Sequence, residues 1–391
     1  MVRKTYSFQT KLLHNRHKFD KDTGAVSVPL YHASTFHQTD FDQFGEFDYS
    51  RSGNPTRKAL EEAIAELEGG TRGFAFSSGM AAISTAFLLL SKGDHVLITE
   101  DVYGGTYRMV TTVLKRFGID YTFVDMSNLH EVASSIKENT RVIYIETPSN
   151  PLLKITDIRG IVKLAKAHQC LTFVDNTFLT PVLQQPLQLG VDLVIHSATK
   201  FLSGHSDVLA GLAVTKDEEL GNRLYQLQNT FGAVLSAHDC WFVLRGLKTL
   251  HVRLEQSSKT AKELAHYLQK HELVEKVYYP GLTDHPGYEV HSYQASGPGA
   301  VLSFELKNEE AVRQFVQHIN IPVFAVSLGA VESILSYPAK MSHAAMLKEE
   351  RVKRGITDGL LRFSVGLESA TDLIDDCCQA LKQGRAISVY K

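Results

Sequence analysis

Short apolar runs and amphipathic stretches alternate through the first half of the chain. Runs rich in Val, Ile, Leu and Phe occupy residues 96–99, 142–146, 171–175 and 193–196, which predicts buried strands. Residues 57–67 instead repeat apolar side chains at helical intervals. Strands that alternate with helices are typical of a mainly parallel sheet covered on both faces, and this is the α/β fold that we expect.

The pattern changes beyond about residue 240. A long helical stretch with regularly spaced leucines begins there, and apolar runs at 300–306 and 360–365 predict the strands of a smaller α+β domain. The residues before 49 show no period and predict an extended arm. We therefore expect an arm at 1–48, an α/β domain that binds the ligand at 49–244, and an α+β domain at 245–391.

Composition and charge place the chain among ordinary globular proteins. Of its 391 residues, 43% are hydrophobic and 21% are charged, which is unlike a disordered chain. Lysine and arginine total 41 against 43 acidic residues, so we expect no binding of nucleic acid or of an anionic membrane. The longest apolar runs, such as 86–90, are too short to span a bilayer, and the N-terminus carries no apolar signal region.

The cysteines and histidines show no pattern typical of a metal site. Cys170, Cys240, Cys377 and Cys378 form no CxxC pair, and the 17 histidines include no HExxH or HxH motif. We therefore expect no bound metal. Thiols without a disulfide framework are typical of a reducing compartment, so we also expect a cytoplasmic location.

Reactive side chains follow the ends of two predicted strands. Lys200 comes shortly after the strand at 193–196, with Ser197 and Thr199 between them, and Asp175 ends the strand before it. The carboxyl ends of parallel strands share one edge of the sheet, where ligands bind. A desolvated lysine forms Schiff bases with aldehydes, and a carboxylate stabilises a pyridinium nitrogen, so the pair suits pyridoxal phosphate.

A third segment, Ser77–Ser78–Gly79 before the helical run at 81–90, offers backbone amides to a phosphate. From these residues alone a second interpretation stays open. Asp175 and Lys200 can be solvated residues at a sheet edge, and the serines can serve only as the N-cap of a helix.

Seven motifs resemble those of the Cys/Met-metabolism family of pyridoxal-phosphate enzymes, and they cover nearly the whole chain. They are Tyr49–Thr56, Ser77–Met80, Tyr103–Gly105, Glu146–Pro151, Val174–Thr177, Ser197–Lys200 and Leu361–Gly366. Within that family the sequence is most similar to the bacterial cystathionine β-lyase branch. The resemblance implies fold type I of the PLP-dependent transferases, the aspartate aminotransferase-like architecture, with pyridoxal 5'-phosphate as cofactor.

The resemblance also implies the role of each site residue. Lys200 would hold the cofactor as a Schiff base and move protons on the substrate, and Tyr103 would stack on the cofactor ring and assist proton transfer. Asp175 would keep the pyridine nitrogen protonated. The other expected cofactor contacts are Ser78, Gly79, Met80, Ser197, Thr199 and Asn150, with Tyr49 and Arg51 reaching the phosphate of a neighbouring subunit. The substrate α-carboxylate would be bound by Arg362, Ser327 and Asn150.

Two peripheral positions bear on the reaction, because the motifs around the cofactor serve β-elimination, γ-elimination and γ-replacement alike. The γ-synthases and cystathionine γ-lyases of the family carry a glutamate where this chain has Val326, and the methionine γ-lyases carry a cysteine where it has Gly105. We therefore expect β-elimination of L-cystathionine to L-homocysteine, pyruvate and ammonia, a carbon–sulfur lyase step of trans-sulfuration in methionine biosynthesis. Cystine and cysteine would be poorer substrates.

Two alternatives stay open. The first is a cystathionine γ-synthase, which joins cysteine to an O-acylhomoserine. The second is a binding or regulatory protein that has kept the fold and lost the chemistry, although such a protein would have no need of Lys200. The resemblance further implies a homotetramer, built as a dimer of dimers with shared active sites.

Overall fold

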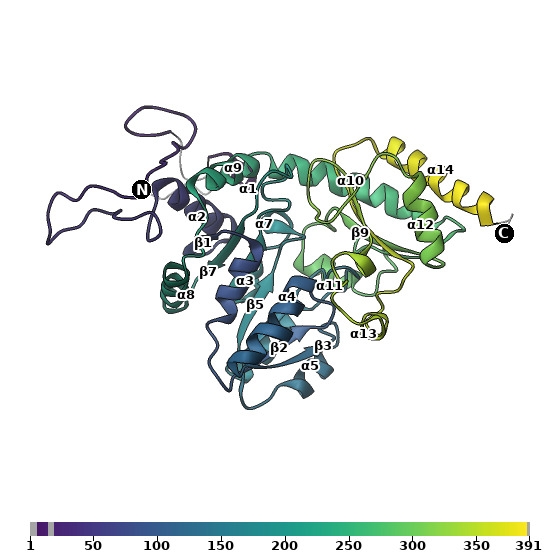
Figure 1. Cartoon of the computed structure of the whole chain (residues 1–391), viewed down its shortest axis with the longest axis horizontal. Helices are drawn as coiled ribbons and strands as arrows, with labels where there is room; N and C mark the ends of the chain where they lie inside the picture. Colours follow the sequence, from purple (N-terminus) through teal and green to yellow (C-terminus); the bar gives the residue numbers. More distant parts are fainter. Residues whose placement is uncertain (1–5, 15–18, 389–391) are drawn as a thin grey trace.

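The computed structural model describes residues 6–14 and 19–388, with side chains up to residue 383. The expected arm at 1–48 and the expected C-terminal domain at 245–391 each include residues outside this part, namely 1–5, 15–18 and 389–391. Two sheets lie side by side in the molecule, and the helix α10 (Leu250–Gln269) runs between them along one edge (Figure 1).

The larger sheet has seven strands. In spatial order they are β1 (Arg72–Phe76), β7 (Gly211–Thr215), β6 (Leu193–Ser197), β5 (Leu171–Asp175), β4 (Thr140–Glu146), β2 (His95–Thr99) and β3 (Asp120–Val124). The strands from β6 to β3 are mutually parallel, and β7 runs antiparallel to both of its neighbours. The mainly parallel sheet and its four predicted strands are therefore confirmed.

Helices cover both faces of this sheet, because its strands alternate buried apolar side chains between two clusters. One cluster packs α3 (Gly79–Phe87) and α8 (Glu218–Phe231), and the chain after α4 (Gly104–Arg108) joins it. The other packs α2 (Pro55–Glu68), α5 (Leu129–Ser135), α6 (Ile158–Ala167) and α9 (Ala237–Leu247), while α7 (Thr180–Leu183) contacts α2. This part also contains a short π-helix at Met109–Val113 and short 3₁₀ helices at Leu114–Phe117 and Pro186–Leu189.

The sequence signals for α2 agree with its observed ends. The Asn54 side chain accepts hydrogen bonds from the backbone N–H groups of Thr56 and Arg57, and Pro55 occupies the first turn, where its missing N–H costs nothing. Gly69 ends the helix in the left-handed conformation at φ 70°. The helical stretch predicted beyond residue 240 forms two helices, α9 and α10, with a break at 248–249.

The smaller sheet has five strands, in the order β10 (Val323–Phe324), β11 (Ile334–Ser336), β12 (Leu360–Ser364), β9 (Val301–Leu306) and β8 (Val274–Tyr278). Its apolar face packs against α10, α12 (Glu309–His318) and α14 (Ala370–Ser388). This part also contains the helices α11 (Tyr288–Gln294) and α13 (Lys348–Lys353) and a short 3₁₀ helix at Pro338–Lys340. The smaller α+β unit is confirmed, and the limits of the three domains stay a prediction.

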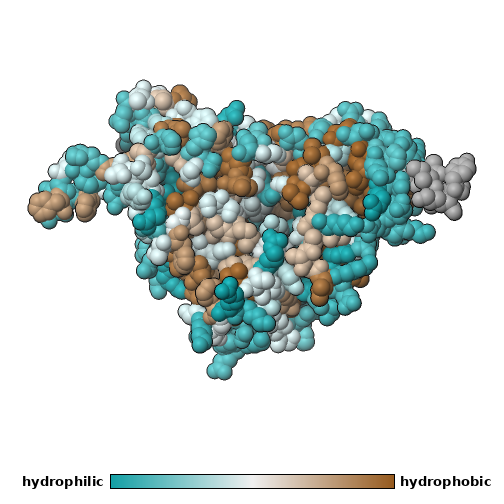
Figure 2. Space-filling view, in the orientation of Figure 1, coloured by the Kyte–Doolittle hydropathy of each residue, from teal (hydrophilic) through white to brown (hydrophobic). Residues whose placement is uncertain are grey.

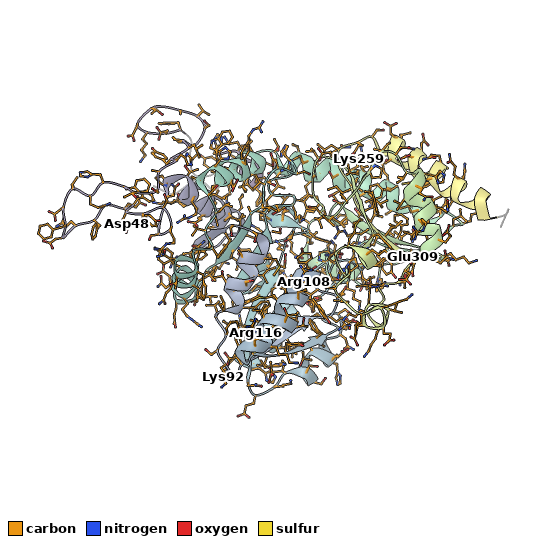
Figure 3. All side chains as sticks on the ribbon, in the orientation of Figure 1. Asp48, Lys92, Arg108, Arg116, Lys259 and Glu309 are labelled. Atoms are coloured by element: carbon orange, nitrogen blue, oxygen red, sulfur yellow. The ribbon has the colours of Figure 1, made fainter. Side chains whose placement is uncertain are left out.

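The N-terminal segment departs from an extended arm at one point. Residues Phe8–His14 form the helix α1, because Leu12 is buried in the core beneath it. Loops within residues 19–48 project from the body of the molecule, and Figure 3 labels Asp48 on that segment. Its outer end is apolar in Figure 2, and Phe41 and Phe44 are 87% and 70% exposed.

Candidate active site

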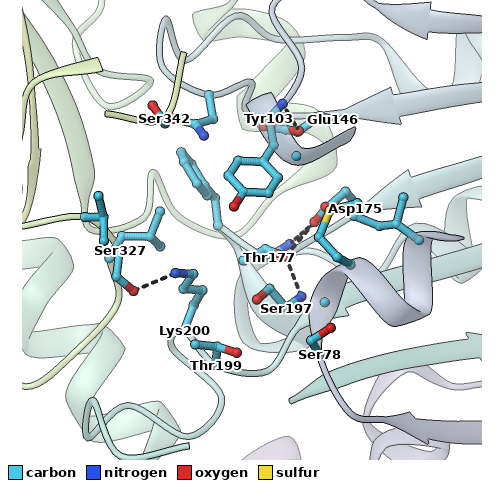
Figure 4. Close-up of a pocket in the computed structure, with 18 of the residues that line it drawn as sticks. Ser78, Tyr103, Glu146, Asp175, Thr177, Ser197, Thr199, Lys200, Ser327 and Ser342 are labelled. Carbon is cyan, nitrogen blue, oxygen red and sulfur yellow. Dashed lines mark hydrogen bonds between the residues drawn. The ribbon is translucent and has the colours of Figure 1, made fainter. Parts of the chain in front are cut away.

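A cavity of about 490 Å³ lies where the carboxyl ends of β4, β5 and β6 face the smaller sheet. Eleven of the thirteen predicted site residues line it: Ser78, Gly79, Met80, Tyr103, Asn150, Asp175, Ser197, Thr199, Lys200, Ser327 and Arg362 (Figure 4). Tyr49 and Arg51 lie outside it. The Arg51 guanidinium donates to the backbone oxygen of Asn229 at 2.7 Å and packs over the Tyr49 ring at 5.6 Å.

Asp175 lies at the end of β5 and is almost fully buried. Its Oδ1 accepts hydrogen bonds from the Thr177 hydroxyl at 2.5 Å and from the Thr177 backbone N–H at 3.0 Å, and the Tyr144 hydroxyl donates to Oδ2 at 3.4 Å. Burial raises the pKa of Asp175, while the bonds from Thr177 oppose that change. A buried carboxylate with this restraint is ready to receive a cation from the cavity.

Lys200 follows β6 and extends into the cavity, where its Nζ donates to Ser327 Oγ at 2.5 Å (Figure 4). Burial, together with the positive charge of Arg362, lowers the pKa of Lys200 from 10.5 to about 8. About a tenth of the amine is therefore neutral at pH 7, and this is the form that attacks carbonyls and accepts protons. Ser327 is held at φ 92°, an uncommon conformation for a residue with a side chain.

The start of α3 forms an anion-binding end of the cavity. Ser78 caps the helix by accepting from the Ala81 N–H at 3.0 Å, whereas the amides of Gly79 and Met80 have no hydrogen-bond partner within the described residues. A Cβ on Gly79 would lie 2.8 Å from the Cβ of Ser197. Because glycine has no Cβ, it permits this close approach of the start of α3 to the end of β6.

A buried arginine supplies a second anion receptor. Arg362 lies on β12, where Leu361 and Phe363 on either side face the apolar core and leave Arg362 on the side of the cavity. Its Nη1 donates to Asn150 Oδ1 at 2.8 Å and its Nη2 to the Ser327 backbone oxygen at 2.7 Å, while Nε has no hydrogen-bond partner in the described part of the chain. Burial lowers the pKa of Arg362 to about 10, although Glu146 opposes the change.

Five polar lining residues were not predicted as site residues: Arg108, Glu146, Thr177, Ser336 and Ser342. Glu146 and Thr177 belong to recognised motifs, and their positions at or just after strand ends were the available signal. Ser342 lies in an irregular segment without a pattern. Arg108 lies at the end of α4, and Figure 3 shows it near the middle of the molecule. Val326 also lines the cavity and is 65% exposed.

Comparison with known proteins agrees with this geometry. A sequence profile described as Cys/Met metabolism PLP-dependent enzyme matches residues 9–382. A protein of Bacillus subtilis (strain 168) named cystathionine beta-lyase MetC is 70% identical over 389 residues, which is 100% of each chain. A cystathionine gamma-lyase of the same strain is 51% identical and covers 96% of this chain and 99% of its own. The crystal structure of cystathionine gamma-lyase from Lactobacillus plantarum complexed with L-serine superposes with a TM-score of 0.95 at 47% identity, covering 97% and 100% of the two chains.

The cavity residues fit pyridoxal phosphate, the cofactor of the matching profile. Lys200 has a lowered pKa, as an amine that forms a Schiff base requires, and the buried Asp175 carboxylate suits a pyridinium nitrogen. The free amides of Gly79 and Met80 suit a phosphate, because a side chain at residue 79 would fill that space. The unpartnered Arg362 Nε suits the carboxylate of an amino acid.

Proposed function

The chain belongs to the Cys/Met metabolism PLP-dependent enzyme family, and from this premise we propose that it is a carbon–sulfur lyase that converts L-cystathionine by β-elimination to L-homocysteine, pyruvate and ammonia. The observation that carries the proposal is the 70% identity, over the full length of both chains, to the Bacillus subtilis protein named cystathionine beta-lyase MetC. Such a reaction belongs to methionine biosynthesis.

The cofactor, when bound, withdraws electrons from the α-carbon of the substrate and so acidifies its proton. Asp175 would support this by holding a proton on the pyridine nitrogen, and its hydrogen bonds from Thr177 favour the charged carboxylate that this role requires. Gly79 and Met80 would bind the phosphate through their amides, with the hydroxyls of Ser197 and Thr199 beside them. Tyr103 would lie against the face of the ring.

Lys200 would take the α-proton of the substrate and return protons at later steps. Its pKa of about 8 allows both roles near neutral pH, because the neutral amine accepts a proton and the ammonium donates one. The hydrogen bond to Ser327 Oγ directs Nζ toward the part of the cavity where Arg362 lies. Removal of the α-proton expels homocysteine thiolate from Cβ, and water then converts the remaining three-carbon fragment to pyruvate and ammonia.

Arg362 would bind the α-carboxylate of the substrate as a bidentate pair. Asn150 Oδ1 and the Ser327 carbonyl hold two of its nitrogens, which fixes the plane of the guanidinium before substrate arrives. This restraint orients the α-carbon relative to Lys200.

Two features of the cavity favour β-elimination over γ chemistry. Val326 places an uncharged side chain on the cavity wall, and Gly105 adds no thiol beside Tyr103. A Cβ on Gly105 would lie 2.5 Å from Tyr103 Cε1, so a larger residue there would displace the tyrosine ring.

We further propose a homotetramer in which Tyr49 and Arg51 complete the phosphate site of a neighbouring subunit, and a cytoplasmic location. The projecting segment with exposed Phe41 and Phe44 supports the assembly, because such side chains need a partner surface. The four free thiols support the location. Over the described residues, no helix has both the length and the hydrophobicity to cross a membrane.

A product assay tests the reaction. The purified enzyme is incubated with L-cystathionine, and pyruvate, 2-oxobutyrate, homocysteine and cysteine are quantified in one sample. We expect pyruvate and homocysteine in equal amounts. Formation of 2-oxobutyrate and cysteine would instead assign γ-cleavage, and no cleavage, followed by cystathionine synthesis from cysteine and an O-acylhomoserine, would assign a γ-synthase.

A variant tests the role of the lysine. We expect Lys200→Ala to abolish turnover while the far-UV circular dichroism stays that of the wild type, because the change removes the proton carrier and no core side chain. Turnover at the wild-type rate would refute this role of Lys200.

A further inference from the structure

Two segments at the edge of the cavity are joined by hydrogen bonds to two buried carboxyl groups. One loop follows β2 and carries Asp101 and Tyr103. The other segment consists of Glu146, the last residue of β4, and the loop after it, which carries Ser149. Glu146 Oε2 accepts the backbone N–H of Tyr103 at 3.0 Å (Figure 4). In the opposite direction, the Ser149 hydroxyl donates to Asp101 Oδ2. Each segment therefore supplies one carboxyl to the other, and we name this pair of bonds the carboxyl clasp.

Burial of both carboxyl groups costs free energy, so a functional role is expected for the contacts that they make. Asp101 is fully buried, and its Oδ1 has no hydrogen-bond partner in the described part of the chain; Glu146 is 5% exposed. Burial raises the pKa of Asp101 to about 6 and raises that of Glu146 well above its ordinary value, with Asp175 as a further cause for Glu146. A neutral carboxyl still accepts a hydrogen bond, so the clasp does not need either charge.

The residues next to the clasp belong to the proposed site. Tyr103 comes two residues after Asp101, and its own N–H is one of the two bonds. Asn150 comes immediately after Ser149, and its Oδ1 accepts from Arg362 Nη1 at 2.8 Å. The clasp thus joins the loop that carries the aromatic ring to the loop that orients the arginine.

The loop after β4 is restrained around Ser149 on both sides. The Ser149 Oγ accepts the Lys154 backbone N–H at 3.0 Å while its hydroxyl donates to Asp101, and the Ser149 N–H donates to the Lys154 carbonyl at 3.0 Å. Ser149 is fully buried. Movement of Asp101 would therefore move the turn that begins at Asn150.

We propose that Asp101 and Glu146 are positioning residues that fix Tyr103 relative to Asn150 and Arg362, so that one amino-acid substrate meets the aromatic ring and the arginine together. The proposal rests on the function proposed above for Tyr103 and Arg362. The clasp acts by hydrogen bonding and not by charge. Neither carboxyl is a catalytic residue in this scheme.

Four variants separate the hydrogen bond from the charge. Glu146→Gln and Asp101→Asn keep an acceptor oxygen in place, whereas Glu146→Leu and Asp101→Ala remove it. The matched control is Glu100→Gln. Glu100 precedes Asp101 in the sequence, but its carboxylate lies outside the clasp and accepts a hydrogen bond from Lys154 Nζ at 2.7 Å. For each variant we measure the visible circular dichroism of the bound cofactor, the dissociation constant of pyridoxal phosphate by fluorescence titration, and kcat and KM with L-cystathionine.

We expect Glu146→Leu and Asp101→Ala to change the visible circular dichroism, which reports ring orientation, and to raise KM about tenfold or more. The amide variants and Glu100→Gln should stay within about twofold of the wild type. Equal loss in the Gln and Leu variants would refute the hydrogen-bond role, and loss of thermal stability with an unchanged dichroism band would make the clasp merely structural. The dichroism and cofactor-binding readouts do not depend on the proposed reaction, which fails only if the wild-type enzyme yields no pyruvate and homocysteine.

Discussion

Removing the charge of Lys200 is expected to stabilise the cofactor-free protein. In the wild type the ammonium is largely withdrawn from water, and beside it lies the positive charge of Arg362. The substitution Lys200→Met keeps an unbranched chain of similar length and removes the charge. It also removes the hydrogen bond from Nζ to Ser327 Oγ.

The magnitude follows from the change in pKa. One pKa unit corresponds to about 1.36 kcal/mol, so lowering the pKa from 10.5 to about 8 sets an upper limit of about 3 kcal/mol on the cost of burying the ammonium. Loss of the hydrogen bond to Ser327 destabilises the variant by about 1 kcal/mol and so reduces this gain. We therefore expect the free energy of unfolding of cofactor-free Lys200→Met to exceed that of the wild type by about 2 kcal/mol at neutral pH.

The pH dependence gives the decisive test. The unfolded chain keeps the lysine proton up to about pH 10.5 and the folded protein loses it near pH 8, so the wild type gains stability as the pH rises between these values. The advantage of the variant is therefore complete below about pH 8 and is lost progressively as the pH rises from there toward 10.5. Denaturant unfolding of both cofactor-free proteins, at equal concentration between pH 7 and pH 10, measures this difference. A difference that is constant with pH, or a wild type that is the more stable at pH 7, would show that the buried Lys200 charge does not destabilise the folded protein.

Three further substitutions test individual parts of the cavity. Arg362→Lys loses the bidentate fork, so we expect KM for L-cystathionine to rise about a hundredfold with a smaller change in kcat; steady-state kinetics that show an unchanged KM would contradict the carboxylate role. Gly79→Ala places a Cβ 2.8 Å from the Cβ of Ser197, so the dissociation constant of pyridoxal phosphate should rise at least about tenfold in a titration of the cofactor-free protein, and wild-type affinity would disprove the tight approach. Val326→Glu adds a carboxyl to the cavity wall, and we expect a larger share of 2-oxobutyrate among the products; an unchanged product ratio would show that residue 326 does not select the reaction.

The main strands and the reactive residues at their ends could be predicted from local sequence pattern. A strand that is buried on both faces needs an unbroken apolar run, so 171–175 and 193–196 were evident from local pattern alone. Because parallel strands present their carboxyl ends at one edge of a sheet, Asp175 and Lys200 could be assigned to the same edge without coordinates. The motifs then added Arg362 and Tyr103 through resemblance to a family.

Several local features were beyond the pattern. The strand β7 was not among the predicted strands, and its direction, antiparallel to both neighbours, is not contained in a local apolar pattern. The short helix α1 forms in the expected arm because Leu12 packs into the core. No local sequence pattern predicts this contact. Glu146 could be seen at a strand end, but its partner, the N–H of Tyr103, could not be identified from the sequence.

The contacts between groups that are distant in the sequence depend on the packing of the whole chain. Arg362 lies in the smaller sheet, yet it is held by Asn150 from the larger domain and by the Ser327 carbonyl. The carboxyl clasp likewise depends on two loops that follow neighbouring strands. Periodicity records which face of an element is buried, because burial acts on each residue in turn. The approach of two loops or two sheets depends instead on how whole faces pack, and no single segment of the chain contains that information.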